Sequence, residues 1–332
     1  MESSSPLLSV LMTVFNAEKY LSASLQSICQ QTFKDWEFLI IDDASTDQSR
    51  RIAQEYAHRD QRFRLITNEH NQGQTICLNQ GLREARGRWI ARQDADDLSL
   101  PTRFEEQMKV IEEYPHLALV GTSGVMINER DELVGLLDVP LRQEVIVWSM
   151  ALANPFLHTS VCFQTNIIRF LGGYDPQYRI AQDYDLWARL IAAGYDTKNL
   201  PNRLVCYRHL DSSLSKKNKE QALEEITTIS ARVARETFGD HLSESQRLLL
   251  QGWRFSGQRG AFWKLYQKLS LLLPQENILV QRDHARFTAM LHLNSAGNST
   301  GMALLKELVA AFMADGAFFI CWIWQRYFSR NF

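Results

Sequence analysis

Residues 1–115 alternate apolar runs with segments of helical spacing, and this alternation constrains the fold more than any other feature of the sequence. Leu7–Val14 and Trp36–Ile41 are continuous apolar runs, which is typical of strands buried on both faces. The spacing predicts further strands over 63–67 and 88–92, and helices over 17–31, 45–58, 74–86 and 101–114. Because the links between these elements are short, the strands should be mostly parallel, with right-handed crossovers. The sequence therefore predicts an α/β fold with a mostly parallel sheet flanked by helices.

Two of the predicted helices carry local signals at their ends. Gly87 follows the helix over 74–86, at a position where glycine commonly stops a helix. Thr102 and Glu105 have the spacing of a capping box for the helix over 101–114. We therefore expect Gly87 to end the first of these helices and Thr102 to cap the second.

Strands and helices are mixed rather than alternating after residue 116. The patterns predict strands over 117–127, 161–163 and 204–208, and helices over 143–152 and 184–193. From about residue 216 the sequence becomes charged and helical. We therefore expect one domain over 1–215, with halves over 1–115 and 116–215, and a C-terminal α-helical region over 216–332.

Charge and cysteine content exclude several classes of protein. The 332 residues include 36 Lys and Arg against 38 Asp and Glu, so no basic field exists and general nucleic-acid binding is excluded. The five cysteines are scattered and form no C-x-x-C pair, which argues against a disulfide framework or a zinc–thiolate site. No basic segment precedes the first apolar run, so we expect a buried strand there rather than a signal peptide. These features together predict a cytoplasmic protein.

Polar side chains follow three of the predicted strands at their carboxyl ends. The first strand leads into the segment 13–16, the second into Asp42 and Asp43, and the fourth into the acidic run 94–97. Ligands of parallel sheets bind outside the carboxyl ends of the strands. We therefore expect these three groups to line one crevice.

The acidic residues in this crevice each have two interpretations. Asp94 and Asp96 are two residues apart at a strand end, so both carboxylates face the same side and suit Mg²⁺ or Mn²⁺ bound with substrate phosphate oxygens. The alternative is an acidic turn in which Asp97 or Ser99 caps the next helix. Asp43 either accepts a hydrogen bond from the base or ribose of a nucleotide, or caps the helix that follows it.

Later in the chain, Asp183 stands at the start of an amphipathic helix, where a carboxylate can serve as an N-cap alone. Asp185 is the competing carboxylate, and we expect it to face elsewhere. His158 and His209 are each either a metal or phosphate ligand or a structural histidine. The sequence contains no G-x-G-x-x-G, P-loop, H-E-x-x-H or G-x-S-x-G motif, so dinucleotide enzymes, P-loop proteins, zincins and α/β-hydrolases lose their main support.

Taken together, these segments resemble the inverting nucleotide-sugar glycosyltransferases of family 2, and the resemblance covers residues 6–215. The matching stretches, in the family's order, are Ser9–Asn16, Leu25–Ile28, Gln31–Phe33, Ile41–Asp47, Asn71–Gly73, Gly87–Ile90, Asp94–Asp97, Pro101 with Arg103, and Gln182–Trp187. Each stretch alone is weak, and their combination in this order is specific.

The resemblance implies the GT-A fold, with a nucleotide-sugar-binding half over 1–115 and an acceptor half over 116–215. Carried over by position, the residues that line the nucleotide-sugar site are Thr13, Phe15, Asn16, Glu18, Asp43, Asp94 and Asp96. Asp96 would be the firmer ligand of a divalent metal, Mn²⁺ or Mg²⁺, which it shares with Asp94. Asp183 would be the catalytic base of a single inverting displacement. The implied donor is a UDP-sugar, and the implied acceptor is a hydroxyl group of a polysaccharide, lipid-linked glycan or glycoconjugate.

The chain departs from the family pattern at two places. Gln182 stands where the family often has Glu, directly before the base. Leu210 stands where the family often has the His of a Tyr-Arg-x-His motif, and His209 is one place early, which puts its role as a metal ligand in doubt.

Two other classes of protein stay open. One is a nucleotidyltransferase on a similar frame, although such enzymes usually carry a glycine-rich loop where Val14–Glu18 has no glycine. The other is a non-catalytic nucleotide-sugar-binding protein of the same fold. The intact residues Asp94, Asp96 and Asp183 argue against this second class.

The most apolar stretch of the chain is Leu308–Gln325, which contains one charge, Asp315, and is followed by Arg326. Its length is at the lower limit for a bilayer span, and a central Asp costs roughly 2.5–3.5 kcal/mol on insertion. Three interpretations stay open: a helix packed against the core or a partner, a helix lying in a membrane interface, and a membrane span. The second predicts peripheral contact with the inner face of the membrane through residues 308–326.

Overall fold

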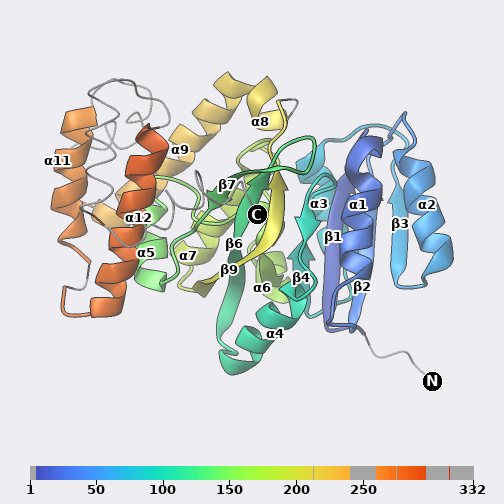
Figure 1. Ribbon diagram of the computed structural model, residues 1–332, viewed down its shortest axis with the longest axis horizontal. Coiled ribbons are helices and arrows are strands. Elements are labelled where there is room, and N and C mark those ends of the chain that lie inside the picture. The colour runs from blue at the N-terminus through green and yellow to red at the C-terminus, as the bar shows by residue number, and fades with distance from the viewer. Residues whose placement is uncertain (1–4, 212, 240–258, 274, 297–313, 315–332) are drawn as a thin grey trace. The chain divides into compact units, whose positions relative to one another are not determined.

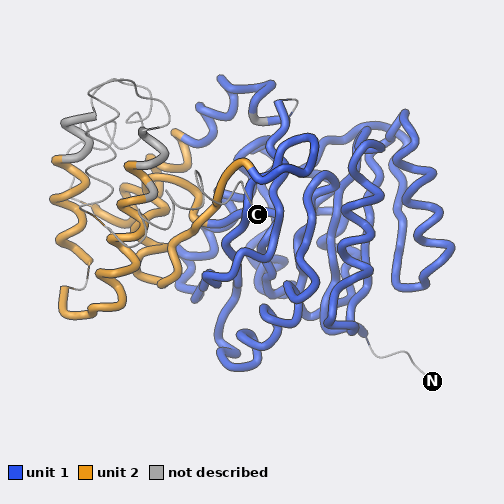
Figure 2. The backbone as a smooth tube through the Cα atoms, in the orientation of Figure 1, with its two compact units in different colours: residues 1–133, 156–226 blue, residues 134–155, 227–332 orange. Residues whose placement is uncertain are grey.

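The computed structural model describes residues 5–211, 213–239, 259–273, 275–296 and residue 314. The chain divides into two compact units, one formed by 1–133 with 156–226 and the other by 134–155 with 227–332 (Figure 2). In this division the segment 134–155 belongs with the C-terminal helices. The domain boundary expected at residue 215 stays a prediction.

The first unit is built on a mixed, mostly parallel sheet (Figure 1). Its strands run in the order β3-β2-β1-β4-β8-β6-β9-β5, with β7 off this path. Pairing is parallel for β2 with β3, β1 with β2 and β4, and β6 with β9, whereas β8 is antiparallel to β4 and β6, and β5 to β9. The strands are β1 (Leu8–Val14), β2 (Trp36–Asp42), β3 (Phe63–Thr67), β4 (Trp89–Arg92), β5 (Leu98–Ser99), β6 (Leu117–Ile127), β7 (Leu133–Leu137), β8 (Cys162–Gln164) and β9 (Asp196–Arg208). The predicted α/β class is confirmed.

Helices connect these strands, as the sequence predicts, and further helices follow the last strand. They are α1 (Glu18–Cys29), α2 (Ser49–Arg59), α3 (Gln74–Glu84), α4 (Arg103–Glu113), the 3-10 turn η1 (His158–Ser160), α6 (Thr165–Phe170), α7 (Gln182–Ala192), α8 (Leu214–Lys217) and α9 (Lys219–Phe238). The apolar runs predicted as buried strands are buried along both faces: the whole of β2, and all of β1 except the partly buried Thr13. The helix expected over 45–58 begins only at Ser49, because the residues before it form a loop that is bonded to the segment after β1.

Gly87 does not end a helix. The helix α3 stops at Glu84, and Ala85 is already extended. A Cβ atom on Gly87 would lie 2.4 Å from the backbone nitrogen of Ser9, so only glycine lets the chain pass this close to β1. The glycine therefore serves the packing of β4 beside β1.

The expected capping box at the start of α4 does not form. Thr102 is the N-cap residue, but its side chain donates to Glu106 at 2.9 Å rather than to the helix backbone. Glu105 instead accepts a hydrogen bond from the hydroxyl of Thr32 at 2.6 Å. Glu105 therefore bonds Thr32, which is distant in the sequence, instead of the start of its own helix.

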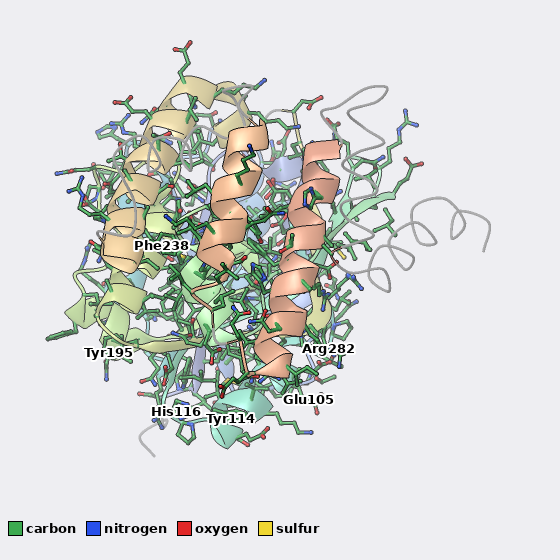
Figure 3. The ribbon with its side chains drawn as sticks, turned by 90° about the vertical axis from the view of Figure 1, so that its left-hand side faces the viewer. Glu105, Tyr114, His116, Tyr195, Phe238 and Arg282 are labelled. Atoms are coloured by element: carbon green, nitrogen blue, oxygen red, sulfur yellow. The ribbon has the colours of Figure 1, made fainter. Side chains whose placement is uncertain are left out.

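The second unit packs around Trp148, in α5 (Gln143–Ser149). The ring centroids of Tyr266, in α11 (Arg259–Ser270), and His284, in α12 (Ile278–Ala296), lie 4.8 Å and 5.1 Å from the Trp148 ring, both edge-on. Asp283 accepts the backbone N–H groups that precede α5, each at 2.8 Å. These contacts explain why 134–155 belongs with the helices α9, α11 and α12, which Figure 3 views from the side.

None of the described helices combines the length and apolar character needed to cross a bilayer. Apart from residue 314, the apolar stretch 308–326 lies outside the described residues, so its three interpretations stay open. Four cysteines, Cys29, Cys77, Cys162 and Cys206, are free thiols.

A buried carboxylate, Glu37, joins the amino-terminal ends of the parallel strands. One of its oxygens accepts the Ser9 hydroxyl at 2.7 Å and the backbone N–H of Arg86 at 2.7 Å, and the other accepts the Arg64 guanidinium at 2.9 Å. The Ser9 hydroxyl oxygen in turn accepts the N–H of Gly87 at 2.8 Å. Because a buried carboxylate is stable only when it is bonded in this way, the network specifies how β1, β2 and the start of β4 align.

We expect Glu37→Ala to lower the free energy of unfolding by about 3 kcal/mol, because it leaves the buried polar partners of the carboxylate unpaired. Glu84→Ala is the matched control, since the half-exposed Glu84 contacts the same Arg64 at 3.6 Å and should cost less than about 1 kcal/mol. Urea unfolding monitored by tryptophan fluorescence measures both values. Equal losses for the two variants would show that the Glu37 network does not specify the sheet.

Candidate active site

The segments that follow β1 and β2 are joined by side chains predicted for the nucleotide-sugar site. Asn16 accepts a hydrogen bond from the first backbone N–H of the loop 46–48 at 2.9 Å, and Glu18 accepts one from the last at 2.8 Å. Asn16 has a φ of 49°, a left-handed conformation that asparagine tolerates. Thr13 is half-buried at the end of β1, and Phe15 is 51% exposed. The structure therefore brings all four residues to the edge where β1 and β2 end.

Asp43 directly follows β2 and is buried. It accepts hydrogen bonds from the Asn68 amide at 2.9 Å and from the backbone N–H groups of Gln72 and Gly73 at 2.9 Å and 2.8 Å. Burial raises its pKa, but these hydrogen bonds outweigh burial, so the pKa of Asp43 lies below its ordinary value. The carboxylate thus stays ionised and holds the loop that leads into α3. Its predicted contact with a nucleotide base stays a prediction.

The acidic run after β4 crowds three carboxylates into one turn. Asp94 pairs with the guanidinium of Arg92 at 2.5 Å. Burial, and then the negative charge of Asp94, raise the pKa of Asp96 to about 6. Asp97 is 1% exposed and accepts the backbone N–H of Arg208 at 2.7 Å, so it caps no helix; burial, and then the charges of Asp96 and Asp94, raise its pKa well above the ordinary value. Burial and the neighbouring carboxylates therefore both disfavour the ionised forms of Asp96 and Asp97, and a bound cation would favour them.

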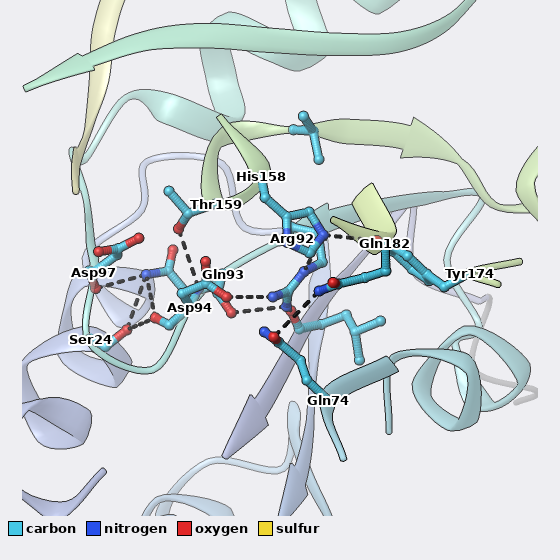
Figure 4. Close-up of polar contacts among 12 residues, drawn as sticks. Ser24, Gln74, Arg92, Gln93, Asp94, Asp97, His158, Thr159, Tyr174 and Gln182 are labelled. Carbon is cyan, nitrogen blue, oxygen red and sulfur yellow. Dashed lines mark hydrogen bonds and ion pairs between the residues drawn. The ribbon is translucent and has the colours of Figure 1, made fainter. Parts of the chain in front are cut away.

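Sequence reasoning missed two buried arginines that hold this acidic turn. Arg92, at the end of β4, is fully buried and bonds the Asp94 carboxylate (Figure 4). Arg208, at the end of β9, is also buried and donates to the backbone carbonyl of Asp96 at 2.8 Å. An arginine that ends an apolar strand is the signal that could have revealed both, because a buried guanidinium requires acceptors nearby.

Asp183 is the second residue of α7 and is partly exposed, with one carboxylate oxygen accepting the N–H of Tyr184 at 2.8 Å. The positive end of the helix dipole favours the ionised form of a carboxylate at this position. Asp185 is buried and lies 2.8 Å from the guanidinium of Arg189, one turn further on. The expectation that Asp185 faces elsewhere agrees with this ion pair. The neighbouring Gln182 donates from its amide to the side chain of Gln74 at 3.3 Å.

Tyr207, in β9, is influenced by both the acidic turn and Asp183. Burial, and then the negative charges of Asp97, Asp94, Asp96 and Asp183, raise its pKa to about 12. Residues that are almost ninety positions apart in the sequence therefore act electrostatically on one phenol. The acidic turn that follows β4 and the first turn of α7 thus both lie within electrostatic range of Tyr207.

Neither histidine is arranged as a metal ligand. His158 Nε2 accepts the Arg92 Nε–H at 3.2 Å, and His209 is exposed with its Nε2 2.8 Å from Lys216 Nζ. Within the described ranges, no group of three or more His, Cys, Asp or Glu side chains is placed to hold a metal ion. The pair Asp94 and Asp96 stays the predicted donor set. Two carboxylates with phosphate oxygens from a substrate match the way in which Mg²⁺ is usually bound.

Comparison with known sequences shows the family. A model described as "Glycosyl transferase family 2" matches residues 9–169. The chain is 38% identical over 209 residues to the glycosyltransferase EpsE of Bacillus subtilis (strain 168), covering 62% of this chain and 74% of that protein. It is 32% identical over 215 residues to the O-antigen biosynthesis glycosyltransferase WbnJ of Escherichia coli, covering 63% of this chain and 82% of that protein.

Solved structures share the fold. S. aureus TarS 1–349 in complex with UDP-GlcNAc superposes with a TM-score of 0.57 and 16% identity, over 98% of this chain and 91% of that one. The mannosyltransferase PcManGT of Pyrobaculum calidifontis, in complex with GDP-Man and Mn²⁺, gives a TM-score of 0.51 and 16% identity, over 98% of this chain and 88% of that one. The fold, the acidic turn and the sequence relatives agree, and the chain is therefore a glycosyltransferase that belongs to glycosyl transferase family 2.

Proposed function

We propose that this glycosyltransferase moves a sugar from a nucleotide-sugar donor to a hydroxyl acceptor and inverts the anomeric carbon. The observation that carries the proposal is that the acidic turn 94–97 and Asp183 both lie within electrostatic range of Tyr207. A transfer of this kind needs carboxylates that hold a metal at the donor's diphosphate and a further carboxylate that takes the proton from the acceptor hydroxyl. The ligands of TarS and PcManGT, UDP-GlcNAc and GDP-Man, support a nucleotide sugar as the donor, and we take a UDP-sugar as the first candidate.

The nucleotide part of the donor would occupy the edge where β1 and β2 end. Thr13, Asn16 and Glu18 lie there beside the loop after β2, and the exposed ring of Phe15 offers an apolar surface. Asp43 directly follows β2 at the same edge, and its contact with the nucleotide base is part of this proposal.

A divalent metal, Mn²⁺ or Mg²⁺, would be held by Asp96 and Asp94 together with oxygens of the donor diphosphate. When bound, it would supply positive charge that stabilises the leaving nucleoside diphosphate. The fit rests on the chemistry of the donor set and on the crowded carboxylates, since burial, and then the charge of Asp94, raise the pKa of Asp96. The Mn²⁺ in the PcManGT complex supports the same assignment.

Asp183 would act as the general base. The acceptor oxygen forms a bond with the anomeric carbon while the bond from that carbon to the diphosphate oxygen breaks, and the acceptor's proton passes to the Asp183 carboxylate. One displacement inverts the anomeric centre, so no covalent sugar–enzyme intermediate is required. The helix start favours the ionised carboxylate that this role needs.

The acceptor would be a growing polysaccharide, a lipid-linked glycan or a glycoconjugate, which the O-antigen relative supports. The proposed catalytic domain is 1–215, with the donor site in 1–115 and the acceptor site in 116–215. The helical region 216–332, with peripheral membrane contact through 308–326 on the cytoplasmic side, remains a prediction.

Asp96→Asn should abolish the metal dependence of nucleotide binding, because it removes one of the two charged metal ligands. We expect the affinity for UDP with Mn²⁺ to fall by at least the ~10–100-fold that loss of an outer-shell metal partner costs. Isothermal titration with Mn²⁺ and with EDTA measures this loss, and the wild-type protein in EDTA should match the mutant. If UDP binds equally in EDTA, the metal assignment is wrong.

Asp183→Asn should remove transfer and leave donor binding intact, because the donor site is built from residues 13–96. We expect the rate to fall on the order of 10²–10⁴-fold, as for loss of a general base. Asp185→Asn is the neighbouring control; it breaks the ion pair with Arg189 and should lower stability, yet cost far less in rate per folded molecule. The transfer rate and the donor affinity are measured for both variants. Near-normal transfer by Asp183→Asn would place the base elsewhere.

A further inference from the structure

Arg92 carries a fully buried positive charge at the end of β4. Its Nη2 bonds the Asp94 carboxylate at 2.5 Å, and its Nη1 donates to the backbone carbonyls of Leu11 and Gln93. Its Nε donates to His158 Nε2 at 3.2 Å. A guanidinium is planar and keeps its charge. The acceptors that bond Nη1 and Nε therefore determine the direction in which Nη2 points toward Asp94. The orientation of Asp94 therefore depends on Arg92 being held.

His158 is the partner that completes this arrangement (Figure 4). Its Nε2 also lies 3.0 Å from the hydroxyl of Tyr174. Since Arg92 can only donate, Nε2 must accept, which assigns the ring proton to Nδ1 and makes the Tyr174 hydroxyl the second donor. Burial, and then the charge of Arg92, keep the pKa of His158 well below its ordinary value, so the ring is neutral as this arrangement requires.

The turn that carries His158 also holds the backbone of Asp94. The N–H of Asp94 donates to the Thr159 hydroxyl at 3.2 Å. The next residue, Ser160, anchors the turn to the sheet, because its hydroxyl exchanges hydrogen bonds with the backbone of Thr122 at 3.1 Å and 3.2 Å. The turn η1 thus holds Asp94 in two ways. Thr159 bonds the Asp94 main chain, and His158 acts on the Asp94 side chain through Arg92.

Tyr174 extends the same network toward the other end of the site. Its backbone is bonded in both directions to the side chain of Asn79, at 2.7 Å and 2.8 Å. Tyr174 precedes α7, the helix that begins with Gln182 and Asp183. The His158 imidazole therefore contacts both Arg92, which bonds the Asp94 carboxylate, and Tyr174, which lies in the segment that leads to α7.

We infer that His158 is a positioning residue of the donor site: through Arg92 it directs the Asp94 carboxylate so that one oxygen is held by the guanidinium and the other faces the metal–diphosphate. The inference rests on the proposed function, because it takes Asp94 as a donor-site ligand. It replaces the interpretation of His158 as a metal ligand, since the Nε2 lone pair is engaged by Arg92. Without that acceptor, the Arg92 Nε–H is buried without a partner and the guanidinium turns to find another one.

A pair of amide substitutions isolates the acceptor at Nε2. Gln reaches about as far as Nε2 and can supply an oxygen there, whereas Asn ends near the Nδ1 position. His158→Asn should weaken the affinity for UDP with Mn²⁺ about tenfold or more, within the ~10–100-fold range found for partners that orient metal ligands. His158→Gln should restore most of it. His116→Gln is the surface control, because His116 is exposed and paired only loosely with Asp196 at 3.8 Å, and it should bind like wild type.

Isothermal titration of UDP, at several Mn²⁺ concentrations, is run on each variant after its thermal transition shows that it is folded. Unchanged affinity in folded His158→Asn, or a loss that His158→Gln does not repair, overturns the inference. If His158→Asn does not fold, Arg92→Lys provides the second test. The lysine keeps the charge but lacks the Nε–H and the fork, so it should weaken UDP–Mn²⁺ binding similarly, and wild-type affinity overturns the inference.

A double mutant separates this inference from the proposed function. Asp94→Asn alone should weaken UDP–Mn²⁺ binding; if it does not, the proposed donor site fails and the inference with it. If Asp94→Asn is impaired while His158→Asn is normal, only the inference fails. When His158 acts through Asp94, adding His158→Asn to Asp94→Asn should cause little further loss. Fully additive losses contradict the positioning role.

Discussion

The parallel pairing of β1 with β2 and with β4 is the constraint on which the rest of the site depends. Val14 pairs with Asp42, and Leu11 pairs with Arg92, so the polar residues that follow these strands emerge at one edge. A shift of one residue would turn each side chain to the opposite face. At the other edge, the buried Glu37 carboxylate and Gly87 hold this alignment.

Buried arginines prepare the acidic turn for its ligand. Arg92 pairs with Asp94, and Arg103 donates to the carbonyl of Arg92 at 2.9 Å. Arg208 donates from its side chain to the Asp96 carbonyl and from its backbone N–H to the Asp97 carboxylate. These bonds fix the Asp94 and Asp97 carboxylates and the backbone of the turn. Groups that are held in place before the ligand arrives need no reorganisation when it binds, which is the general basis of electrostatic preorganisation.

The strands and the acidic turn were predictable because each leaves a local mark: an uninterrupted apolar run, or carboxylates directly after one. The details at helix ends were not. Gly87 stands where a glycine typically ends a helix, but its role is to allow close packing against Ser9. Thr102 and Glu105 have the spacing of a capping box, yet Glu105 bonds Thr32, from the end of another helix. Local signals fail where a distant partner satisfies the same side chain better.

The sequence by itself determined the order of strands and helices, the polar residues at the strand ends, and the family to which the chain belongs. Only the tertiary structure decided that Asp183 shares an electrostatic environment with Asp94 and Asp96, and that His158 bonds Arg92. The physical reason is that periodicity reports which face of one element is buried. It does not report which elements become neighbours, because that depends on the strand order of the folded sheet, and here β8 and β9 join the sheet out of chain order.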